Sequence, residues 1–143
     1  MSGSVSICQI DDELKAALKK FRYRKEKTVA AIVMKIEPDK MLVIEDEAYD
    51  DIEDIEEFVG ELPEHIPRYI AFSYVLNHDN GRVSYPLCFI FVSPSGAKPE
   101  LQMMYAGSKL EVVNELGITK VFELRSTEEF TEEWLKSKLA FFK

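Results

Sequence analysis

Histidine, cysteine and carboxylate side chains are the groups in this sequence that could hold a metal ion or carry out catalysis. The histidines are His65 and His78, and the cysteines are Cys8 and Cys88. None of them has the spacing of a zinc site. The acidic run of residues 45–57 lacks the ligand spacing and the glycine of a calcium loop. We therefore expect no metal, no cofactor and no enzyme activity.

The tripeptide Gly107-Ser108-Lys109 is similar to the end of a phosphate-binding loop. The upstream glycine of such a loop is missing, and the tripeptide falls inside a predicted helix, where backbone N–H groups are already bonded. Cys88 lies in an apolar strand pattern, which indicates a core residue and not a nucleophile. An enzyme that uses a pair of carboxylates stays open as an alternative, although the pattern singles out no such pair.

The composition is that of a soluble globular chain. Its 143 residues are 46% hydrophobic and 31% charged, and the net charge is -8. This charge disfavours nucleic acid as a partner, because phosphate binding needs a clustered basic surface. The start of the chain has no signal-peptide pattern, and no apolar run approaches the roughly 20 residues that span a membrane. We expect a reduced, cytoplasmic monomer with a single domain over residues 1–143, of which residues 1–10 form a mobile arm.

Hydrophobic periodicity predicts alternating helices and strands. Asp11 and Asp12 are typical of a helix N-terminus, and this first helix should run to about Phe21. The predicted strands cover residues 29–37, 41–46, 68–76, 83–93 and 120–124, and the other helices cover residues 52–59, 98–116 and 131–142. Pro86 should mark either a bulge in its strand or a place where no N–H donor is required for the ladder. The order predicts an α/β, α+β-like fold with a central mixed β-sheet flanked by helices on both faces.

The predicted helix over residues 98–116 is apolar on two sides. One side has ordinary core spacing and comprises Leu101, Met104, Tyr105, Ser108, Val112 and Leu116. The opposite side comprises Met103, Ala106, Leu110 and Val113. A helix that lies on a sheet buries only one side in the core. The second side is therefore either covered by the C-terminal segment or left for a partner.

Basic residues gather at the end of the first predicted helix, with Lys20 and Arg22 among them. One interpretation is a favourable interaction with the negative end of the helix dipole on a solvated face. The other is a contact site for an acidic partner surface. The sequence pattern leaves both open.

The heptapeptide MMYAGSK at residues 103–109 resembles the long helix of the actin-depolymerising factor/cofilin homology (ADF-H) fold. FRYRKEK at 21–27, DNGRVSYPLCFIF at 79–91, TKVFELR at 119–125 and TEEWLKSKLAFF at 131–142 are similar to the glia maturation factor branch of that family. The resemblance extends over essentially the whole chain and implies the ADF-H fold.

The resemblance implies a binding protein without a cofactor. Glia maturation factors bind the actin-related protein 2/3 complex, inhibit its nucleation of actin filaments and promote debranching. The helix match puts Met103, Gly107, Ser108 and Lys109 at the primary binding surface, and helical geometry adds Leu110. The resemblance at FRYRKEK also makes the basic segment of residues 19–27, with Lys20 and Arg22, a secondary candidate for partner binding. A second surface, with Asp79 and Arg82, is expected to face the first actin subunit of the daughter filament. The implied location is the cytoplasmic actin cytoskeleton, in cortical or lamellipodial networks, with the nucleus as a second location.

The sequence also departs from cofilin. Glu111 and Glu115 follow Lys109 where cofilin has several lysines, and the loop at 77–82 is short and nearly neutral. These changes disfavour the alternative function, a cofilin-type protein that severs or depolymerises filaments, because like charges across an interface cost free energy. Ser2 is a candidate phosphorylation site, since a phosphate there would add negative charge near the partner surface.

Overall fold

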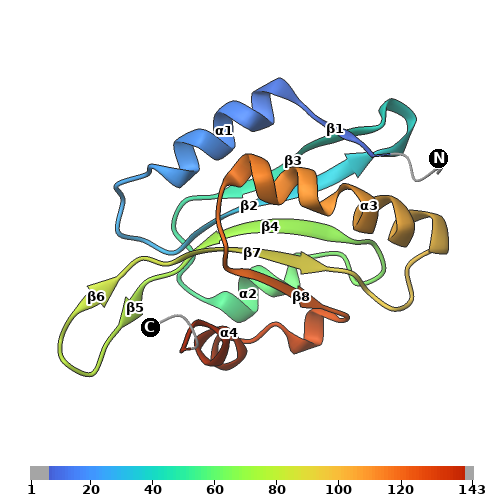
Figure 1. Cartoon of the computed structure of the whole chain (residues 1–143). Coiled ribbons are helices and arrows are strands. Elements are labelled where there is room, and N and C mark those ends of the chain that lie inside the picture. The colour runs from blue at the N-terminus through green and yellow to red at the C-terminus, as the bar shows by residue number, and fades with distance from the viewer. Residues whose placement is uncertain (1–6, 141–143) are drawn as a thin grey trace.

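A six-stranded mixed sheet forms the centre of the molecule (Figure 1). The computed structural model describes residues 7–140. The strands are β1 (Gln9–Ile10), β2 (Ala30–Glu37), β3 (Leu42–Tyr49), β4 (Arg68–Ser73), β7 (Leu87–Val92) and β8 (Val121–Leu124), in the spatial order β1-β3-β2-β4-β7-β8. The two outer strands run parallel to their neighbours, and the inner pairs are antiparallel. The predicted mixed sheet is therefore confirmed.

Helices cover both faces of the sheet, as predicted. α1 (Asp12–Arg22) and α3 (Pro99–Leu116) lie on one face, and α2 (Ile55–Gly60) and α4 (Glu132–Leu139) lie on the other (Figure 1). Strand β2 separates the two cores by alternation, since Ile32 and Met34 pack under α1 and α3 while Ala31 and Val33 pack toward α2 and α4. This burial on both sides explains the nearly continuous apolar runs of the central strands.

The helix ends follow from local chemistry. The Asp11 carboxylate accepts a hydrogen bond from the Glu13 N–H at the start of α1, and the Thr131 hydroxyl accepts one from Trp134 at the start of α4. Gly117 ends α3 at φ +72°, a left-handed conformation that costs glycine little. The predicted helix limits therefore agree with the structure to within a few residues.

The prediction of continuous strands over residues 68–76 and 83–93 is wrong. The structure breaks them and forms a separate ribbon from β5 (Leu76–Asn77) and β6 (Val83–Ser84). Pro86 lies at the break, where its missing N–H ends the ladder and its carbonyl accepts a hydrogen bond from the Tyr74 N–H over 3.0 Å. The resulting hairpin projects from one end of the sheet (Figure 1).

The prediction of a mobile arm over residues 1–10 is wrong for Gln9 and Ile10. Gln9–Ile10 form β1, with the Gln9 N–H donating to the Met41 carbonyl over 3.1 Å. Cys8 and Ile10 are buried in the core. A two-residue strand has no detectable periodicity, which is why the sequence pattern missed it. Residues 1–6, including Ser2, lie outside the described residues, as do residues 141–143, which include the end of the helix predicted over residues 131–142.

Two hydrogen bonds that involve tyrosine hydroxyls hold α3 on the sheet. The Ile36 N–H of β2 donates to the Tyr105 hydroxyl over 2.9 Å. The Tyr69 hydroxyl of β4 donates in turn to the backbone carbonyl of Tyr105. Burial raises the pKa of Tyr105, so the phenol stays neutral at physiological pH. These directional bonds fix the rotation of α3 about its axis.

The substitution Tyr105→Phe should lower the free energy of unfolding by about 1–3 kcal/mol, because it leaves the buried Ile36 N–H without its acceptor while nearly preserving volume. Urea denaturation measures the change. Tyr23→Phe, at an exposed tyrosine on the end of α1, is the matched control and should have almost no effect. Equal stability of Tyr105→Phe and the wild type would contradict the importance of this bond.

Candidate partner-binding surface

The outward side of α3 presents apolar side chains to solvent. Met103 is 61% exposed and Leu110 is 67% exposed, and Ala106 between them is also exposed. We call these three residues the outer face of α3. Of the four residues of the predicted second apolar side, these three are therefore uncovered. The use of the outer face in partner binding stays a prediction.

Val113 does not belong to the outer face. It is half-buried and packs against the core with Leu101 and Met104. The other predicted possibility, that the C-terminal segment covers this side of the helix, does not hold for Leu110. The apolar surface is thus a short stripe on the first two-thirds of the helix.

The prediction that Ser108 contacts a partner is wrong. Its side chain is 0% exposed, and its hydroxyl oxygen accepts a hydrogen bond from the Cys8 N–H over 3.0 Å. Helical periodicity correctly placed Ser108 on the core side, whereas the motif resemblance assigned it to the surface. Gly107, its neighbour, is half-buried at the border of the outer face.

Lys109 borders the outer face on the side of β8. Its Nζ atom lies 3.4 Å from Oε1 of Glu123 and 5.9 Å from the centroid of the Phe91 ring. The aliphatic stem therefore lies on apolar surface, as snorkelling lysines do. A partner carboxylate would share this ammonium with the half-exposed Glu123.

The basic end of α1 divides into structural and exposed groups. Lys20 is exposed, whereas Arg24 donates to the Thr28 carbonyl over 2.9 Å and is a structural residue. The Arg22 guanidinium lies against Gly117 at the end of α3, where a Cβ would come within 2.3 Å of it. Sequence reasoning missed Tyr23. Its side chain is 64% exposed, and the Arg22 guanidinium lies over its ring, 5.4 Å from the ring centroid. An aromatic residue between basic ones was the available signal.

Asp79 and Arg82 lie in the turn of the β5–β6 hairpin. The turn is held by the His78 N–H, which donates to the Arg82 carbonyl over 2.8 Å, and by the Asn80 side chain, which accepts from the Arg82 N–H over 3.0 Å. His78 Nε2 lies 2.8 Å from Oγ of Ser84 and ties the two strands together. Both predicted residues are exposed at this tip.

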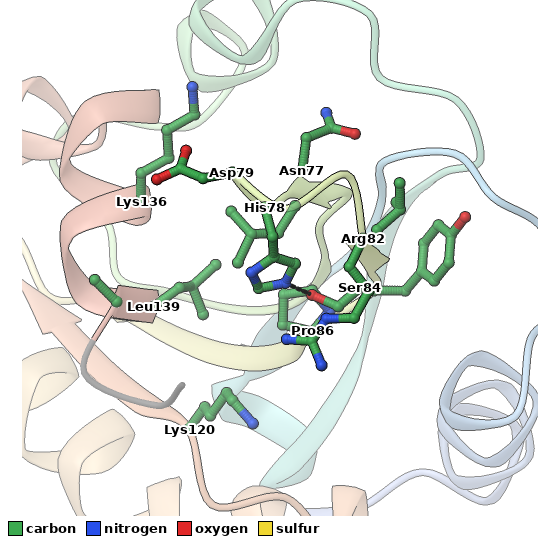
Figure 2. Close-up of a pocket in the computed structure, with 13 residues that line it drawn as sticks. Asn77, His78, Asp79, Arg82, Ser84, Pro86, Lys120, Lys136 and Leu139 are labelled. Carbon is green, nitrogen blue, oxygen red and sulfur yellow. Dashed lines mark hydrogen bonds between the residues drawn. The ribbon is translucent and has the colours of Figure 1, made fainter.

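A cavity of about 540 Å³ separates this hairpin from α4. Figure 2 shows Arg82 of the hairpin, Lys120 at the start of β8 and Lys136 of α4 around it, with Leu139 on one wall. The sequence pattern did not connect these cations, because they come from segments far apart in the chain. Together with the Asp79 carboxylate, which also lines the cavity, they give this region an excess of positive charge in a protein of net charge -8.

The predicted site residues therefore fall into two separate regions. α3 and the end of α1 lie over one face of the sheet, whereas the hairpin with Asp79 and Arg82 projects from its end beside α4 (Figure 1). The structure brings Met103, Lys109 and Leu110 together on one helix. It does not bring the hairpin residues to them.

The metal-ligating and nucleophilic side chains of the described residues can be placed in the structure. No group of three His, Cys, Asp or Glu residues among residues 7–140 could hold a metal ion. Burial raises the pKa of Cys88 to about 12, which keeps it a thiol. No helix within the described range is long and apolar enough to cross a membrane.

Comparisons with known proteins agree with this geometry. The family model described as cofilin/tropomyosin-type actin-binding protein matches residues 7–140. Human glia maturation factor beta is 56% identical over 142 residues, which cover 99% of both chains. Glia maturation factor of Drosophila melanogaster is 47% identical over 93% of this chain and 96% of its own.

The solution structure of glia maturation factor from Caenorhabditis elegans has the same fold. It superposes with a TM-score of 0.80 at 40% identity, over 96% of this chain and 99% of that one. The chain therefore belongs to the glia maturation factor branch of the ADF-H family of actin regulators.

Proposed function

We propose that this protein binds the actin-related protein 2/3 complex, inhibits its nucleation of actin filaments and promotes the dissociation of branches. Membership of the glia maturation factor branch supports this proposal. The observation that carries it is the exposed outer face of α3, with Met103 and Leu110 at its two ends. Apolar side chains that are exposed together on one helix are a common docking surface for a protein partner.

The charge on α3 disfavours cofilin-like binding to the side of an actin filament. Glu111 and Glu115, one and two turns after Gly107, are exposed on α3 beyond Lys109. Negative charge at this end of the helix would repel an acidic surface and would weaken cofilin-like binding. The exposed Lys20 at the end of α1 adds positive charge on the same face of the sheet, where it can steer association.

The β5–β6 hairpin supplies a second contact in this proposal. Asp79 and Arg82 are exposed at its tip, away from α3. A protein with two separate contact regions can touch two neighbouring subunits of a branch at once. We assign the outer face of α3 to the nucleating complex and the hairpin to the first actin subunit of the daughter filament. In this proposal the protein binds the two subunits in a relative position that differs from the one they hold in the intact branch. It thereby promotes debranching, because a ligand shifts an equilibrium toward the state that it binds better.

Fluorescence microscopy of branched filaments tests this function directly. Purified protein should shorten the lifetime of branches in a concentration-dependent manner, because it binds the displaced arrangement of the junction better than the intact one. Unbranched filaments are the control and should stay intact. Branches that persist at the unassisted rate would rule out the proposal, and cutting of unbranched filaments would favour the cofilin-type alternative.

The double variant Met103→Ala/Leu110→Ala should bind the actin-related protein 2/3 complex at least about tenfold more weakly, because apolar anchors carry much of an interface's binding energy. Its melting temperature should be unchanged, since both side chains are exposed. Titration of the purified complex measures the affinity, and calorimetry measures the melting.

Val112→Ala provides the contrasting control on the same helix. Val112 is fully buried, so this variant should lose stability and, once folded, should keep its affinity. Wild-type affinity of the Met103/Leu110 double variant would show that α3 does not dock through its outer face.

A further inference from the structure

The outer edge of β3 is open over most of its length. β2 pairs with β3 along its inner side, whereas β1 pairs with its outer side only at Leu42 and Val43. Within residues 7–140, no other strand lies on that side of the sheet. The N-terminal segment bonds to the carbonyls of Met41 and Val43, so the next peptide unit that faces outward is that of Glu45. Such an unpaired edge is a template for another strand.

Two hollows lie end to end between this open edge and α1, which contacts β3 (Figure 1). The first has a volume of about 490 Å³ and lies between Leu14 of α1 and Ile44 of β3. The second has a volume of about 240 Å³, lies between Phe21 of α1 and Ala48 of β3, and carries charges of both signs. Glu45 lines both hollows, so they form one groove, which we call the α1–β3 groove.

The rim of the first hollow is acidic. Its charged lining residues are Asp11, Glu13, Glu37 and Glu45, with Lys40 as the cation among them. The Nζ atom of Lys40 lies 4.0 Å from Oε1 of Glu37, and the Asp11 carboxylate caps α1. Glu13 and Glu45 are exposed, and no ion pair joins either of them to a cation among residues 7–140. These two carboxylates therefore favour a basic partner at the open edge.

A second copy of this chain does not suit the groove. Pairing of two β3 edges would bring Glu45 and Glu47 of each copy together, and like charges on paired strands are destabilising. A β-bulge opposite Val33 and Met34 also bends β3, so the open edge accepts a short segment. An extended segment that alternates apolar and basic residues fits better. Its backbone can continue the ladder while its cations reach Glu13 and Glu45.

We propose that the α1–β3 groove binds a short, extended, basic segment of a partner protein as an added strand beside β3. The peptide unit of Glu45 pairs with the backbone of that segment, and the carboxylates of Glu13 and Glu45 select its charge. The outer face of α3 does not line this groove, so the site is independent of the proposed function.

A peptide of six alternating valine and lysine residues, acetylated and amidated at its ends, is the probe for the full-length protein. In NMR spectra of the backbone amides, the resonances of Ala17, Glu45 and Ala48 should shift in a saturable manner. Hydrogen exchange of the Glu45 N–H should become at least about tenfold slower, because this group gains a hydrogen bond. β8, the outer strand at the opposite edge of the sheet, is the internal control and should not respond.

Two altered peptides separate backbone pairing from charge. Methylation of alternate backbone nitrogens removes the donors of an added strand and should weaken binding at least about tenfold. Replacement of the lysines by glutamates should weaken it by a similar factor, because the groove is acidic. Full affinity of the methylated peptide would overturn the added strand, and full affinity of the glutamate peptide would overturn the selection of a basic partner.

Glu45→Lys should weaken binding of the valine–lysine peptide at least about fivefold, since it replaces attraction by repulsion at the pairing point. Glu47→Lys is the matched control. Glu47 lies in the same strand and is also exposed, but it does not line the groove, so this variant should lose less than about twofold. Equal losses in the two variants would show general attraction to an acidic protein and would overturn the site.

Ala48→Trp tests the groove itself. Ala48 is exposed, so the bulky side chain should fill the second hollow, abolish peptide binding and leave the melting temperature unchanged. Peptide binding that persists in this variant, no binding by the wild type, or self-association of the free protein through β3 would each overturn the proposal. No actin-related protein takes part in these experiments, so such a failure would not affect the proposed function.

Discussion

The hydrogen bond from the Ile36 N–H to the Tyr105 hydroxyl fixes the long helix on the sheet. A helix that is apolar on two sides gains burial in more than one rotation, because the hydrophobic effect has no direction. Hydrogen bonds do have direction. The contacts of Tyr105 and Ser108 therefore decide which side of α3 enters the core. They leave Met103 and Leu110 in solvent as a consequence.

The rotation of α3 about its axis determines which side chains are exposed on one face of the molecule. The chain enters the fold beside the middle of the helix at Cys8, and the Arg22 guanidinium lies against its last turn at Gly117. The N-terminal segment therefore meets α3 near its middle, and the basic end of α1 lies at its C-terminal end. The hairpin region lies elsewhere, at the end of the sheet, and has its own cations around a cavity. Two regions of different chemistry suit a protein that touches two partners.

Features with local chemistry could be predicted from the sequence. Asp11 and Gly117 mark helix ends through their own backbone and side-chain preferences, and the alternation of apolar residues predicts a sheet that is covered on both faces. Strand β1 could not be predicted, because its two residues are ordered only by pairing with a distant strand. For the candidate site, Ser108 shows what could not be predicted from the sequence. Its motif suggested a surface residue, but its hydroxyl bonds to the N–H of Cys8, 100 residues away, and no local pattern reveals that contact.

Hydroxyl-radical footprinting with and without saturating actin-related protein 2/3 complex measures the solvent exposure of individual side chains of α3. Met103 and Leu110 are exposed in the free protein, whereas Tyr105 between them is buried and provides an internal reference. If the outer face of α3 docks onto the complex, modification of Met103 and Leu110 falls several-fold on binding while Tyr105 stays unreactive. Equal modification of Met103 and Leu110 in the free and bound states would contradict docking through this face.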